Sequence, residues 1–169
     1  MMLRRFSVHA AIVAWIAITA ATVPAPARSA DMLATHRLSA QIANDIAVAS
    51  IAACAKLTYN ITAVVVDNDG VIQSLIRGDG AGIHTVQTAQ DKAFTAVTYG
   101  RPGSETGKTF AANPTAGVVL KEPRLIPGDG GLPIKIGNEV VGALGISGSP
   151  GKDEVCGNSA LDTVKARLR

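Results

Sequence analysis

Two pairs of short apolar runs, each separated by a few turn-forming residues, constrain the fold of this chain most strongly. Residues 61–66 and 71–76 flank the sequence Asp-Asn-Asp-Gly, and residues 133–136 and 140–147 flank a turn at Gly137-Asn138. β-Branched runs of this length are typical of strands, and a short Asn/Gly turn between them is typical of a β-hairpin. Because the two strands of a hairpin run in opposite directions, the sequence predicts an antiparallel sheet.

Helical spacing of apolar residues marks three other segments. A helix is predicted over residues 40–57, with Ser39 as its N-cap, because one apolar stripe recurs at steps of four and three: Leu38, Ile42, Ile46, Ala49, Ala53 and Leu57. The same pattern predicts a second helix over residues 85–99, with Thr85 as its cap, and a third over residues 153–168. Helices that pack on an antiparallel sheet define the α+β class.

The segment between the second helix and the second hairpin is harder to assign. Residues 100–114 are polar and rich in glycine and proline, which predicts a loop with one helical turn at 105–111. Strand-like runs follow at residues 117–120 and 124–126. The predicted order of elements is therefore α-β-β-α-β-β-β-α in a single domain over residues 31–169.

The first 30 residues have the pattern of a secretory signal peptide. Arg4 and Arg5 precede an uncharged apolar run over residues 11–23, which is too short to span a bilayer and ends in a cluster of prolines and small residues. Cleavage is expected between Ala27 and Ala30. Both an ordinary and a twin-arginine export route fit this segment. We expect a periplasmic or secreted protein with no membrane attachment after processing.

Removal of residues 1–30 changes the charge of the chain. Three arginines leave with that segment, and the remaining 13 basic residues balance the 13 acidic residues of the whole sequence. Only four aromatic residues are left, so neither a basic surface nor a stacking platform for bases is expected. Nucleic-acid binding is therefore disfavoured.

The two cysteines, Cys54 and Cys156, both lie in the exported part. An even number of cysteines in an oxidising compartment predicts one disulfide, here closing a loop of about 100 residues. Two buried free thiols are the alternative.

Residues with ligand-binding potential gather around two glycine clusters. His84 follows the Gly-rich segment 78–82 at the start of the second helix, where it is either a metal ligand or an exposed loop histidine. Lys92, two turns later, is either a ligand contact or a solvated lysine. Gly130 and Gly131 enter a strand, which indicates unusual backbone angles, a close neighbour or a plain turn.

Two nucleotide-binding motifs are matched incompletely. The segment 103–109 contains Gly-Lys-Thr, but Pro102 stands where a phosphate-binding P-loop needs glycine. The spacing G-x-G-x-G in residues 78–82 also differs from the dinucleotide fingerprint. No hydrolase or zinc motif is present, and nucleotide binding is not predicted.

Several segments together resemble the GlcG/HbpS-like family, the haem-binding or haem-degrading domain also found at the C-terminus of PduO-type proteins. The resemblance covers nearly all of the exported chain and rests on the order and spacing of five matching segments: 64–67, 77–81, 89–93, 130–134 and 141–148. The family usually has methionine where this chain has Gly78. The resemblance implies a five-stranded antiparallel sheet flanked by helices, homo-oligomers and haem as a cofactor.

Three functions follow from this resemblance. The first is an exported protein that binds haem or another tetrapyrrole, with no catalytic residues assigned. Arg77, Lys92 or Arg124 would pair with the propionates, His84 would approach the iron, and Gly130 and Gly131 would complete the binding region. The second is an enzyme that degrades haem. The third is an accessory or sensor module that binds a small organic ligand or a partner protein, such as a sensor or a dehydrogenase.

Overall fold

The computed structural model describes residues 33–113 and 115–168, so the predicted signal peptide lies outside the described residues. The helices are α1 (Ala40–Ala55), α2 (Thr85–Tyr99), α3 (Gly103–Ala112) and α4 (Asp153–Val164), with short 3₁₀ segments η1 (Ala116–Lys121) and η2 (Lys165–Arg167). The strands are β1 (Thr62–Asp67), β2 (Ile72–Arg77), β3 (Gly131–Ile136) and β4 (Glu139–Ser147).

The four described strands form one antiparallel sheet in the order β2-β1-β4-β3. Both predicted hairpins are present, as β1–β2 and β3–β4, and β1 joins them by pairing Thr62 with Ser147 and Asp67 with Gly142 of β4. The α+β class and the antiparallel sheet are confirmed. The prediction of five strands is wrong, because the described residues form four.

The two segments that were predicted as additional strands satisfy their backbone groups locally. Residues 117–120 lie in η1, where the amide of Val118 donates to the carbonyl of Thr115. The amide of Ile126 donates to the hydroxyl of Thr95 on α2, at 2.8 Å, instead of to a neighbouring strand. A short apolar run does not distinguish these arrangements from a strand.

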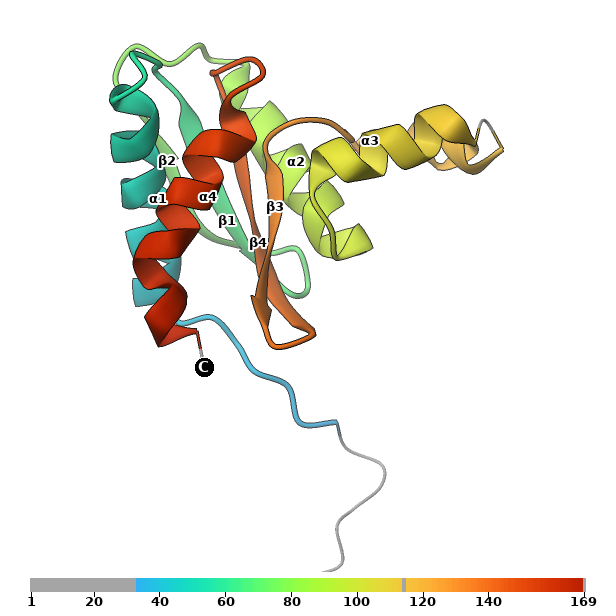
Figure 1. Ribbon diagram of the computed structural model, residues 1–169, viewed down its shortest axis with the longest axis horizontal. Helices are drawn as coiled ribbons and strands as arrows, with labels where there is room; N and C mark the ends of the chain where they lie inside the picture. Colours follow the sequence, from blue (N-terminus) through green and yellow to red (C-terminus); the bar gives the residue numbers. More distant parts are fainter. Residues whose placement is uncertain (1–32, 114, 169) are drawn as a thin grey trace, which may run out of the picture. The chain divides into compact units, whose positions relative to one another are not determined.

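The predicted loop at 100–114 is mostly the helix α3, which extends away from the sheet beyond α2 (Figure 1). Pro102 stands at its N-cap, and Glu105 lies in its first turn, where an acidic side chain favours a helix start. The Gly-Lys-Thr sequence of the incomplete P-loop motif is part of this helix. Its residues are therefore not arranged as a phosphate-binding loop.

Helices cover both faces of the sheet (Figure 1). One face packs against α1 and α4 through the larger apolar cluster, which includes Ile46, Val65, Leu144 and Ile146. The other face packs against α2 through small residues, among them Ala89, Ala93 and Ala96. Because α2 contacts this second face with alanines and not with bulkier side chains, the helix lies close to the strands.

A disulfide joins α1 to α4. Cys54 and Cys156 are bonded across 102 residues of sequence, and both side chains are buried. The prediction of a single disulfide is confirmed. No helix among the described residues is long and apolar enough to cross a membrane.

Candidate functional site

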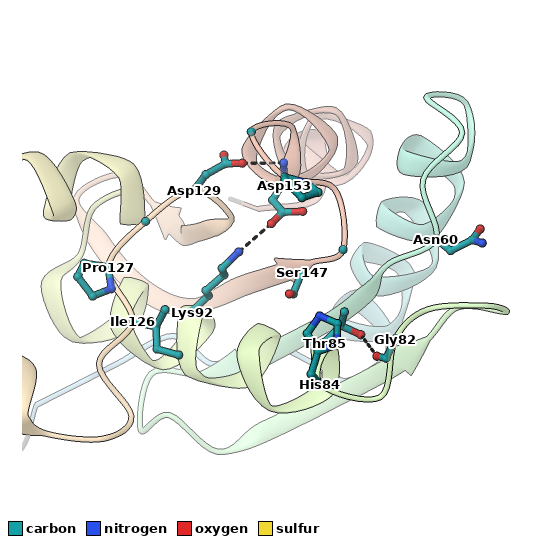
Figure 2. Close-up of a pocket in the computed structure, with 14 residues that line it drawn as sticks. Asn60, Gly82, His84, Thr85, Lys92, Ile126, Pro127, Asp129, Ser147 and Asp153 are labelled. Atoms are coloured by element: carbon teal, nitrogen blue, oxygen red, sulfur yellow. Dashed lines mark hydrogen bonds and ion pairs between the residues drawn. The ribbon is translucent and has the colours of Figure 1, made fainter.

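A pocket of about 480 Å³ opens at the end of the sheet where β4 finishes and both α2 and α4 begin (Figure 2). Its volume falls within the range of small-molecule sites. Four segments that are distant in sequence supply its lining: Asn60, Gly82, His84, Thr85, Lys92, Ile126, Pro127, Gly128, Asp129, Ser147, Gly148, Pro150, Gly151 and Asp153.

An ion pair between Lys92 and Asp153 forms part of the pocket wall. The Lys92 Nζ lies 2.7 Å from Asp153 Oδ2, and the two side chains are only 12% and 4% exposed. The same Nζ donates to the carbonyl oxygen of Ile146 at 3.2 Å. Figure 2 shows the ammonium of Lys92 reaching across from α2 to the start of α4. Lys92 is therefore a fixed part of the site and not a solvated helix lysine.

Glycines in β3 and β4 allow α2 and Lys92 to approach the sheet. A Cβ at Gly145 would lie 1.9 Å from the carbonyl oxygen of Ala89, and a Cβ at Gly131 would lie 2.6 Å from that of Lys92. Gly130 has φ +112° and its Cβ would lie 3.1 Å from Lys92 Nζ. Gly130 therefore has both the unusual backbone and the close neighbour that the sequence indicated, whereas Gly131 has only the close neighbour.

The carboxylates of the pocket are bonded to protein donors. Asp153 Oδ1 accepts from the amide and the hydroxyl of Ser149, at 2.8 and 2.6 Å. Asp129 accepts from the amides of Asp153 and Glu154, at 2.9 and 3.0 Å, and so satisfies the N-terminus of α4. Each carboxylate oxygen of Asp129 and Asp153 therefore accepts at least one hydrogen bond from within the protein.

His84 lies on the opposite wall, at the N-terminus of α2. It occupies the N-cap position without a side-chain capping bond, and its ring packs over Gly82, where a Cβ would lie 2.7 Å from His84 Cε1. Thr85, which was predicted as the cap, is the first helical residue. Its hydroxyl bonds to that of Thr62 at 2.7 Å and donates to the carbonyl of Gly82 at 2.6 Å.

The two predicted arginines have other contacts and do not line the pocket. Arg77 donates to the carbonyl oxygen of Ala81. Arg124 stacks on the ring of Phe94, with its Cζ 3.5 Å from the ring centroid. A role of these two arginines in ligand binding therefore stays a prediction.

His36, the other histidine among the described residues, pairs with Glu139. Its Nδ1 lies 2.6 Å from Glu139 Oε2 and its backbone amide donates to Oε1 at 2.9 Å, which lowers the pKa of Glu139. It does not line the pocket. Within residues 33–113 and 115–168, no group of three or more His, Cys, Asp and Glu side chains is placed to hold a metal ion.

Sequence reasoning missed Asp153, Asp129, Ser149 and Asn60. Asp153 is 61 residues from Lys92, and only the fold brings them together. One local signal was available for Asp153 and Glu154, because acidic residues in the first turn of a helix complement its dipole. That signal indicates a helix start and not a partner for Lys92.

A protein-family model described as "Haem degrading protein HbpS-like" matches residues 38–162. This chain belongs to the HbpS-like family. The match spans α1, all four strands, α2 and most of α4, and it includes every segment that lines the pocket. No curated protein matches the sequence significantly.

Solved structures share the HbpS-like fold. The crystal structure of a double mutant of HbpS from Streptomyces reticuli is 30% identical, with a TM-score of 0.74, and the match covers 85% of this chain and 98% of that one. ORFY from Klebsiella pneumoniae is 24% identical, with a TM-score of 0.74 and coverage of 82% and 98%. A PduOC:heme complex is 23% identical, with a TM-score of 0.67 and coverage of 75% and 94%.

Proposed function

We propose that this protein is an exported haem- or tetrapyrrole-binding protein whose ligand occupies the pocket between α2 and α4. The observation that carries the proposal is the exposed imidazole of His84 on the wall of a pocket of about 480 Å³. Family membership supports the choice of ligand, because the family description names haem and a related fold was solved as a haem complex.

Two features of the pocket, an imidazole and an apolar wall, fit such a ligand. His84 supplies an imidazole, which is a common axial ligand of haem iron, and its side chain makes no capping bond that would have to break. Ile126 and Pro127 supply apolar surface on the wall near Lys92 (Figure 2). Bound haem would supply an iron atom that the imidazole of His84 would ligate. The chain supplies the imidazole, the apolar contact and a fixed cation.

Export and self-association belong to the same proposal. The disulfide supports export, because such bonds persist in oxidising compartments. Exposed apolar side chains on the edge strand β2 (Ile72, Leu75) and on η1 (Val118, Val119) support a homo-oligomer.

Titration with haemin tests the binding site. We expect a saturable shift of the Soret band in the purified protein. His84→Ala should weaken binding at least about tenfold, the effect of losing roughly 1.4 kcal/mol. His36→Ala is the matched control, because His36 is bonded to Glu139, and it should leave the titration unchanged. A titration of the wild-type protein that does not saturate would contradict the proposal. A titration of His84→Ala that matches the wild type would show that His84 does not contribute to haemin binding.

The family description also makes haem degradation a candidate function. The loaded protein can be supplied with ascorbate under air and followed by its Soret band. Our proposal expects the band to persist at least as long as that of free haemin. Faster loss of the band with release of iron would assign degradation instead.

A further inference from the structure

We infer that the Lys92 end of the pocket binds the carboxylate of a small organic acid. This inference requires no tetrapyrrole and does not rest on the proposed function. A tetrapyrrole propionate carries the same chemical group, so small acids and their neutral amides, without any tetrapyrrole, are the appropriate probes.

One N–H group of the Lys92 ammonium is not used in hydrogen bonds to the described residues. An ammonium carries three N–H groups. Among the described residues, two of them are used, one by Asp153 Oδ2 at 2.7 Å and one by the carbonyl oxygen of Ile146 at 3.2 Å. Because Lys92 also lines the pocket, the third N–H is available to a ligand.

The two carboxylates at this end of the pocket already accept hydrogen bonds from the protein. Asp153 is occupied by Lys92 and Ser149, and Asp129 by the amides that begin α4. Lys92 offsets the charge of Asp153, and the amides at the N-terminus of α4 stabilise the charge of Asp129. A ligand oxygen therefore meets a charged donor, and charge-assisted bonds of this kind are the stronger ones.

The position of the ammonium is fixed before a ligand arrives. The Lys92 side chain is 12% exposed and is held from two sides. Gly130 leaves the space that the ammonium occupies, since a Cβ there would lie 3.1 Å from Nζ. A cation that is already ordered loses little side-chain entropy on binding, which favours affinity.

The neighbouring wall indicates the rest of the ligand. Ile126 and Pro127 line the pocket beside Lys92 (Figure 2). A carboxylate on Lys92 would place a short apolar body against these two residues. The ligand class is therefore a monocarboxylic acid with a small apolar body.

NMR titrations that follow both ligand and protein signals, with butyrate and benzoate and with the neutral amides butyramide and benzamide, test this inference. The purified wild-type protein should bind each acid at least about tenfold more tightly than its amide. The side-chain signals of Lys92 should shift during titration with the acids only. Equal binding of acid and amide, or an unmoved Lys92 signal, would overturn the inference without any variant being made.

A double variant provides the matched test. Lys92→Met combined with Asp153→Asn removes both charges and so leaves no unpaired buried carboxylate. It should lose the preference for acid over amide, whereas Lys108→Met, at an exposed lysine on α3, should keep it. Retention of the preference in the folded double variant would also overturn the inference. If the acids do not bind, this inference is wrong, but the result of the haemin titration does not change. The two proposals can therefore be contradicted independently.

Discussion

Replacing both Cys54 and Cys156 by alanine is expected to lower the free energy of unfolding by up to about 4–5 kcal/mol. The disulfide closes 102 residues, and on the chain-entropy model a loop of this length gives a stabilisation of that size. A domain of this size is stable by roughly 5–15 kcal/mol, so the loss is a large part of the total. Urea denaturation of the wild-type and double-alanine proteins measures it.

A reductant supplies the control for this prediction. Dithiothreitol should destabilise the wild-type protein by a similar amount and leave the double variant unchanged, because only the wild type has a bond to reduce. A difference between wild type and variant of less than about 1 kcal/mol would contradict the entropic account.

Gly145→Ala is expected to destabilise the protein by about 3 kcal/mol or more, at the upper end of overpacking effects. The added Cβ would lie 1.9 Å from the carbonyl oxygen of Ala89 and 2.6 Å from the amide nitrogen of Ala93. Both atoms belong to the backbone of α2, so no side-chain rotation relieves the clash. The whole helix must move away from β4. Urea denaturation measures this loss as well.

Gly117→Ala is the matched control for Gly145→Ala. A Cβ at Gly117 meets nothing within 4 Å. An added methyl group there restricts the unfolded chain and should change stability by less than about 1 kcal/mol. Equal stability of the two variants would contradict the claim that α2 packs directly on the backbone of β4.

Local patterns predicted the regular elements of this fold well. The hairpin turns and the extent of α2 depend on neighbouring residues and are found as expected. Helix α1 ends at Ala55 and not at Leu57, and the residues it buries are Ala43, Ile46, Ala47, Ser50 and Cys54, so only Ile46 of the predicted stripe is fully buried within it. The runs at 117–120 and 124–126 failed as strands because strand formation requires a partner edge. Here the hydroxyl of Thr95, on a helix about 30 residues earlier, accepts from the amide of Ile126.

The candidate site was predicted in part. His84 was selected for its position beside a glycine cluster and Lys92 from the family resemblance, and both line the pocket. Asp153, which pairs with Lys92, and Ser149, which bonds to Asp153, are far from Lys92 in sequence, and no local pattern identifies them as its partners. Gly145 was noted within a matching segment, but only the packing of α2 explains why that position lacks a side chain.

The location of bound haem is the central claim, and paramagnetic NMR tests it most directly. Ferric haemin broadens the amide signals of nearby residues, and gallium protoporphyrin, which is diamagnetic, serves as the control. We expect broadening centred on Gly82, Thr85, Ser147 and Gly148 at the pocket. The hairpin turns at Gly70 and Gly137, at the other end of the sheet, should stay sharp. Broadening centred on those turns, or none that saturates with added haemin, would contradict the account.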